Sequence, residues 1–95
     1  MGTYIVLSKM TTGAFQDHTG FKESVMSVVE EISKECPGVK FKDSYATLGQ
    51  YDFIDIIETD DPAQLEKAVL IMRSTGKSET QTLVATHFRE FLARH

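Results

Sequence analysis

Residues 51–58 read Tyr51-Asp52-Phe53-Ile54-Asp55-Ile56-Ile57-Glu58. A short apolar run that is rich in isoleucine predicts a β-strand, because β-branched side chains fit the pleated surface of a sheet. Successive side chains of a strand point to opposite faces, which places Ile54 and Ile56 on one face and Phe53 and Ile57 on the other. Both faces are therefore apolar, which is typical of a central strand that is covered on both sides.

The residues around this strand predict a βαββαβ order. Alternating or β-rich segments predict the strands, and apolar residues at helical spacing predict the helices. The strands are expected over residues 3–9, 39–48, 51–58 and 78–86, and the helices over residues 19–36, 62–76 and 88–94. This is the ferredoxin-like pattern of an α+β fold, a four-stranded antiparallel sheet with two helices on one face. The first and third strands are expected side by side in its centre.

Local signals set the expected helix starts. Asp17 or Thr19 can cap the first helix by accepting free backbone N–H groups. Asp61 is the expected N-cap of the second helix, with Pro62 at the first helical position, where its missing N–H costs nothing. Gln64 stands where a capping-box partner of Asp61 would be.

The second strand and the loop after it form the first half of a predicted hairpin over residues 39–58. Simple alternation places Phe41 and Tyr45 on one face of this strand and Ser44 on the other. Gly49 and Gln50 interrupt the two strands.

Composition bounds the function. The 95 residues weigh 10.7 kDa, which predicts one domain, and the net charge of −4 without a basic cluster argues against nucleic-acid binding. The single cysteine, Cys36, excludes an internal disulfide and any multi-cysteine metal site. No apolar run approaches the ~18 residues of a membrane span. We expect a cytoplasmic domain that needs neither a metal nor a cofactor.

The two central strands indicate a partner for the sheet. In the first strand, as in the third, both faces carry large apolar residues: Ile5 and Leu7 on one, Tyr4 and Val6 on the other. Two helices cover one face only, and an open apolar face usually marks an interface or ligand site. A homodimer through this face is the simplest cover. The alternative is that the C-terminal segment folds across the sheet.

The segment from Leu48 to Glu58 resembles the signature of the GYD domain family, named after a Gly-Tyr-Asp motif that Gly49, Tyr51 and Asp52 match. The opening residues 4–8 and the stretch 80–83 also resemble that family. The resemblance implies a ferredoxin-like domain of the dimeric α/β-barrel type. It implies no reaction, because activities of the wider group would be carried over by analogy of fold alone.

Five residues are candidates for binding a small molecule: Tyr51, Asp52, Asp55, His18 and Tyr4. Tyr51 and Asp52 can line a pocket at the end of the central strand, or simply build the turn. Asp55 interrupts an apolar strand, and a buried carboxylate needs partners or a raised pKa. It is either a functional group or a residue paired with a neighbouring strand. His18 precedes the first helix, where a solvated histidine is the usual outcome.

Three functions remain open on these residues. The favoured hypothesis is a dimeric module that binds or senses a small molecule without catalysis. The alternative is a cofactor-independent enzyme of the monooxygenase or isomerase kind, working in a pocket between sheet and helices with Tyr51, Asp52, Asp55 or His18 as acid–base groups. The third is an assembly protein whose sheet face only oligomerises.

Overall fold

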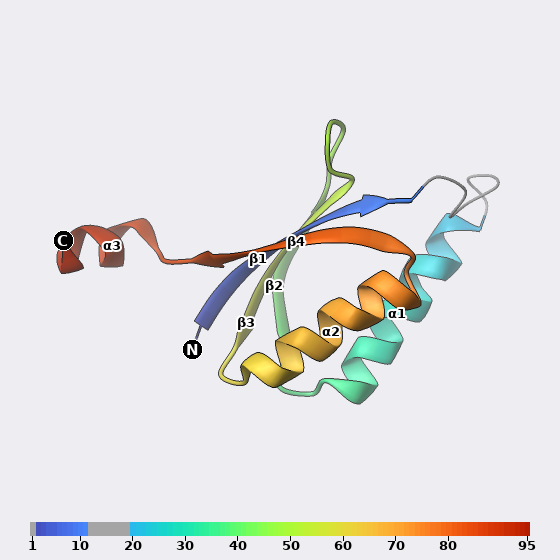
Figure 1. Ribbon diagram of the computed structural model, residues 1–95, viewed down its shortest axis with the longest axis horizontal. Coiled ribbons are helices and arrows are strands. Elements are labelled where there is room, and N and C mark those ends of the chain that lie inside the picture. The colour runs from blue at the N-terminus through green and yellow to red at the C-terminus, as the bar shows by residue number, and fades with distance from the viewer. Residues whose placement is uncertain (1, 12–19) are drawn as a thin grey trace.

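The computed structural model describes residues 2–11 and 20–95. Its elements follow the order β1, α1, β2, β3, α2, β4, α3 (Figure 1). Their bounds are Gly2–Met10 for β1, Phe21–Glu35 for α1, Lys40–Ala46 for β2, Phe53–Thr59 for β3, Pro62–Ser74 for α2, Ser78–Ala85 for β4 and Phe88–Arg94 for α3. The predicted βαββαβ order with a short C-terminal helix is confirmed.

The four strands form one antiparallel sheet in the order β2-β3-β1-β4. The first and third strands are therefore central, as predicted. Ile57 of β3 lies opposite Tyr4 of β1, and Val6 lies opposite Asp55. These four residues share the face of the sheet that α1 and α2 cover (Figure 1).

The core lies between this face and the helices. Its buried members come from both layers and are Val6, Ile32, Cys36, Ile57, Leu65, Ala68, Ile71 and Met72. The layers are unevenly joined, because α2 packs against β3 and β4, whereas α1 packs against α2 and approaches no described strand as closely. The sheet below α1 is thus less tightly covered than the sheet below α2.

The second helix starts as its sequence predicts, with one difference. The Asp61 side chain accepts a hydrogen bond from the backbone N–H of Ala63 at 2.9 Å, and Pro62 opens the helix. Gln64 does not complete a capping box; its Oε1 accepts from the backbone N–H of Gly38 at 2.6 Å instead, and so ties α2 to the end of α1. The first helix has Gly20 as its N-cap residue, without a side-chain cap. The predicted caps at residues 17 and 19 lie outside the described residues.

A bulge changes the faces of β2. The register of β2 against β3 shifts between Phe41 and Asp43, because an extra residue in one strand offsets every later side chain. Phe41 lies opposite Ile57 on the helix side, but Tyr45 lies opposite Ile54 on the other side. The prediction that Phe41 and Tyr45 share a face was wrong. Ser44 now lies opposite Asp55, on the face below the helices.

The face away from the helices carries a continuous apolar patch. The cross-strand register brings its members side by side over all four strands: Ile5, Leu7, Tyr45, Ile54, Ile56 and Leu83. We call these six residues the open-face patch. Tyr45 is 53% exposed and Leu83 is 38% exposed, while the other four are half-buried by their neighbours.

The C-terminal helix does not cover this patch. It extends beyond the end of β4, away from both helices (Figure 1), and packs against no other helix or strand of the described chain. The alternative in which the C-terminal segment folds across the sheet was therefore wrong. Three apolar side chains of α3 are left exposed, Phe88, Phe91 and Leu92. No described helix is long and apolar enough to cross a membrane.

Candidate functional site

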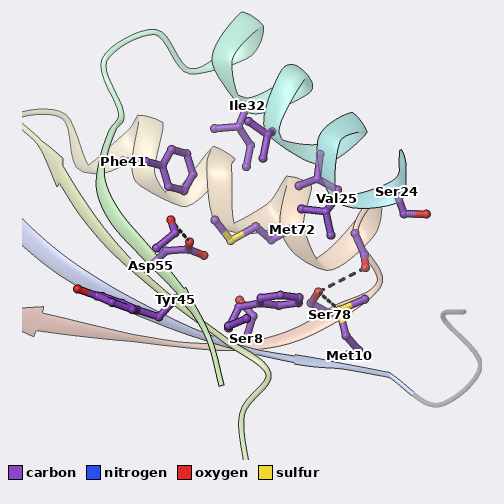
Figure 2. A pocket seen from close by; sticks show the side chains of 16 residues that line it. Ser8, Met10, Ser24, Val25, Ile32, Phe41, Tyr45, Asp55, Met72 and Ser78 are labelled. Atoms are coloured by element: carbon purple, nitrogen blue, oxygen red, sulfur yellow. Dashed lines mark hydrogen bonds between the residues drawn. The ribbon is translucent and has the colours of Figure 1, made fainter. Parts of the chain in front are cut away.

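The space below α1 is a cavity of about 420 Å³. It lies between α1, the end of α2 and the β2–β3 half of the sheet (Figure 2). Most of its walls are apolar, and the lining residues are Ser8, Met10, Ser24, Val25, Val28, Val29, Ile32, Phe41, Ser44, Tyr45, Ala46, Phe53, Asp55, Met72, Gly76 and Ser78. Clefts of this size and character are typical of small-molecule sites.

The cavity follows from the sequence of α1 and from how this helix is held. Val25, Val28, Val29 and Ile32 recur at helical spacing and face the sheet side. Only Ile32, near the end of α1, is fully buried among them. At the start of α1, Phe21 stacks on Phe53 of β3 with ring centroids 5.6 Å apart. Between Phe21 and Ile32 the three valines border the cavity instead of closing it.

Asp55 is the one carboxyl group among the described lining residues. It is half-buried, and its Oδ1 accepts a hydrogen bond from the Ser44 hydroxyl at 2.6 Å, drawn as a dashed line in Figure 2. Burial raises the pKa of Asp55 above the ordinary value, and the hydrogen bond from Ser44 opposes this effect only in part. A carboxyl group in an apolar wall is therefore held closer to neutrality than one in water.

This environment predicts a pH-dependent stability. Because the pKa of Asp55 is raised in the folded state, its contribution to stability is present below the ordinary aspartate pKa and is lost as the pH rises through the folded pKa. We expect Asp55→Asn, which keeps the shape and an acceptor for Ser44, to gain stability relative to the unmodified protein as the pH rises through that range. Urea unfolding at a series of pH values measures the difference.

A second variant tests the cause. Ser44→Ala removes the hydrogen bond that lowers the pKa of Asp55, so this variant should lose stability more steeply with rising pH. Parallel stability curves for the two variants and the unmodified protein would contradict the assignment.

The Gly-Tyr-Asp motif builds the β2–β3 connection and not the cavity. Gly49 has a φ of 151°, a conformation that favours glycine. The Asp52 carboxylate accepts a hydrogen bond from the backbone N–H of Met10 at 2.7 Å, and the Asp52 N–H donates to the carbonyl of Ser8 at 2.8 Å. The Tyr51 hydroxyl donates to Gln81 Oε1 at 2.6 Å. These contacts join the loop to β1 and β4.

The five candidate site residues are thus not brought together. Asp55 lines the cavity, whereas Tyr51, Asp52 and Tyr4 do not. Tyr4 lies on the helix-covered face and lines a separate polar hollow of about 230 Å³ beside Glu90 and Arg94 of α3. His18 lies outside the described residues. In the described ranges, no group of three or more His, Cys, Asp or Glu residues is placed to hold a metal ion.

Ser44 is the site residue that sequence reasoning missed. Simple alternation placed Ser44 on the opposite face of β2 from Phe41. The bulge at Lys42 brings Ser44 onto the same face as Phe41, below the helices. Cys36 is fully buried, and burial raises the pKa of its thiol.

Comparison with known proteins gives the family. The family model for the GYD domain matches residues 4–93. The chain belongs to the GYD domain family. This GYD domain is 34% identical over 94 residues to the "Glutamine synthetase and cystathionine beta-lyase binding protein" of Thermus thermophilus, which covers 99% of this chain and 98% of the relative. The resemblance of residues 48–58 to the family signature is confirmed.

Solved structures show the same fold. A leucine response regulatory protein of Mycobacterium tuberculosis superposes with a TM-score of 0.62 at 14% identity, over 90% of this chain. The GYD domain spans about half of that regulator, 51% of its length. A hypothetical protein of Pyrococcus horikoshii gives a TM-score of 0.57 at 24% identity, over 92% of both chains. Identities this low support the ferredoxin-like fold and nothing further.

Proposed function

We propose that this GYD domain binds a small, largely apolar molecule in the cavity below α1. The cavity itself is the observation that supports this function. An apolar space of about 420 Å³ inside a 95-residue chain weakens the packing of its own core, since unfilled volume forfeits contacts between side chains. A ligand would restore those contacts.

Binding is favoured over catalysis. Among the described lining residues, the acid–base groups are Asp55 and Tyr45, but the Tyr45 hydroxyl donates to Asp43 at 2.7 Å, and Tyr51 and Asp52 bond elsewhere. General acid–base catalysis usually needs a second group within hydrogen-bond reach of the substrate. The monooxygenase- or isomerase-like alternative therefore has less support from the site than a binding or sensing role.

The proposed module is a dimer through the open-face patch. The patch is apolar, lies on the sheet face that the described helices leave uncovered, and spans all four strands. A two-fold axis would place this face against the same face of a second copy, which buries both patches. Each domain would then keep its own cavity on the helix side of the sheet, with Tyr45 belonging to both the patch and the cavity wall.

If a ligand occupies the cavity, a larger side chain in the cavity wall should prevent its binding. We expect native mass spectrometry of the purified protein to detect a retained small molecule, or to detect added 2-(1-naphthyl)ethanol as a bound species. Val25→Phe should abolish this adduct, because the phenyl ring occupies the cavity that Val25 lines.

The matched control is Met26→Phe. Met26 is the next residue of α1, is 47% exposed and does not line the cavity, so its replacement should leave binding unchanged. Equal loss in both variants, or no adduct with the unmodified protein, would contradict the proposed function.

A second candidate function is docking to an enzyme. The Thermus relative is named as a binding protein for two enzymes, and α3 carries exposed Phe88, Phe91 and Leu92 on a helix that packs against no other described element. Exposed aromatic side chains are frequent anchors of protein interfaces. We infer that α3 can contact glutamine synthetase or cystathionine β-lyase.

Removing the aromatic side chains of α3 tests this docking role. The double variant Phe88→Ser with Phe91→Ser should weaken binding to the purified enzyme by about ten-fold or more, as loss of an aromatic anchor does. Biolayer interferometry against each enzyme measures it, with Leu70→Ser as a control at an exposed apolar residue of α2. A double variant that binds the enzymes as tightly as the unmodified protein would exclude α3 as the docking element. The same conclusion would follow if the double variant became monomeric but kept its affinity for the enzymes.

A further inference from the structure

The polar groups of the cavity below α1 differ in what they offer a ligand. The second oxygen of Asp55, Oδ2, receives no hydrogen bond from any described residue, since Ser44 donates to Oδ1. An acceptor with a free oxygen in an apolar wall is best met by a hydrogen-bond donor on the ligand. Figure 2 shows Asp55 at the sheet wall of the cavity, on the side of Met72 of α2.

The described part of the cavity wall offers no countercharge for an anion. None of the described lining residues is Lys, Arg or His. A ligand carboxylate or phosphate would therefore lie near Asp55 without a cation, and like charges at short range repel more strongly in an apolar environment than in water. The remaining polar side chains of the described wall are neutral hydroxyls, those of Ser8, Ser24, Tyr45 and Ser78.

We propose that the cavity selects neutral or cationic molecules that carry an apolar body and one hydrogen-bond donor, an alcohol or an amine, and rejects carboxylates of the same shape. This inference rests on the proposed small-molecule function and names its ligand class. Asp55 is the selecting residue, and Ser44 orients its carboxyl group by holding Oδ1. The volume admits a body of the size of a bicyclic aromatic ring.

Three probes of one shape separate charge from size: 2-(1-naphthyl)ethanol, 2-(1-naphthyl)ethylamine and 1-naphthylacetate. Binding is followed by the fluorescence anisotropy of the naphthyl group, because the chain has no tryptophan to interfere. We expect the alcohol and the amine to bind the unmodified protein about ten-fold or more tightly than the carboxylate, as an uncompensated like charge implies.

Two variants assign the selection to Asp55. Asp55→Asn removes the charge and should narrow the difference between alcohol and carboxylate to about three-fold or less, because the repulsion is gone. Glu79→Gln removes the same charge from an exposed side chain of β4 that does not line the cavity, and should leave the selection intact.

The outcomes separate this inference from the function on which it rests. Selection in the unmodified protein that Asp55→Asn abolishes and Glu79→Gln keeps supports it. Equal binding of all three probes, or equal effects of the two variants, overturns the ligand class while small-molecule binding stands. No binding of any probe, with no retained ligand in the native mass spectrum, overturns both.

Discussion

An Ile54→Glu variant is expected to abolish the dimer that we propose for the unmodified protein. Ile54 lies in the centre of the open-face patch, opposite Leu7 on β1 and Tyr45 on β2. In a two-fold interface each substitution is present twice, so two carboxylates would be placed between apolar surfaces. Burying an unpaired charge costs several kcal/mol, so the dimer dissociation constant should rise by about a hundred-fold or more.

Sedimentation velocity measures this change directly, as a fall from about twice 10.7 kDa to 10.7 kDa. Leu70→Glu is the matched control, because Leu70 is 61% exposed on α2, outside the open-face patch. If Ile54→Glu does not fold, Leu83→Glu tests the same interface, because Leu83 is a more exposed member of the patch. A monomeric unmodified protein at micromolar concentration, or two patch variants that remain dimeric, would refute the interface.

An Ile57→Ala variant is expected to lose about 2–5 kcal/mol of unfolding free energy, the usual cost of truncating a buried isoleucine. Ile57 is fully buried on the helix-covered face of β3, opposite Tyr4 and Phe41. The loss is large because the neighbouring strands are held by backbone hydrogen bonds and cannot move in to fill the space. It is a substantial part of the about 5–15 kcal/mol by which domains are stable.

Urea unfolding at one fixed protein concentration measures this loss, since association also contributes to apparent stability. Ile57→Val provides a milder step of about 0.5–1.5 kcal/mol if the alanine variant does not fold. Leu70→Ala, at an exposed side chain of α2, should change stability by about 0.5 kcal/mol or less. Equal effects at Ile57 and Leu70 would contradict the assignment of the core.

Much of the fold can be predicted from local patterns. The strand at residues 53–59 is apolar on both faces, and this pattern alone predicted its central place in the sheet. Asp61 and Pro62 start α2 because their capping chemistry acts within one turn. Signals of this kind depend on residues that are close in sequence, so they can be read without the tertiary structure.

The candidate site was less predictable because it depends on distant residues. Asp55 was identified as an unusual carboxyl group, but its partner Ser44 lies on another strand, in a register that a bulge sets. The Gly-Tyr-Asp motif indicated the family correctly, yet Asp52 bonds to the backbone of Met10, 42 residues away. A motif in the sequence therefore does not by itself place its side chains at a ligand.

The sequence by itself determined the element order, the central strands, the apolar second face of the sheet and the likeness to the GYD family. These properties follow from side-chain periodicity, which is a local property of the chain. The tertiary structure alone decided that Asp55 and Ser44 meet, that α1 stands over a cavity and that α3 leaves the sheet uncovered. Cavities and cross-strand pairs arise from the distances between packed layers, and those distances depend on all the layers together.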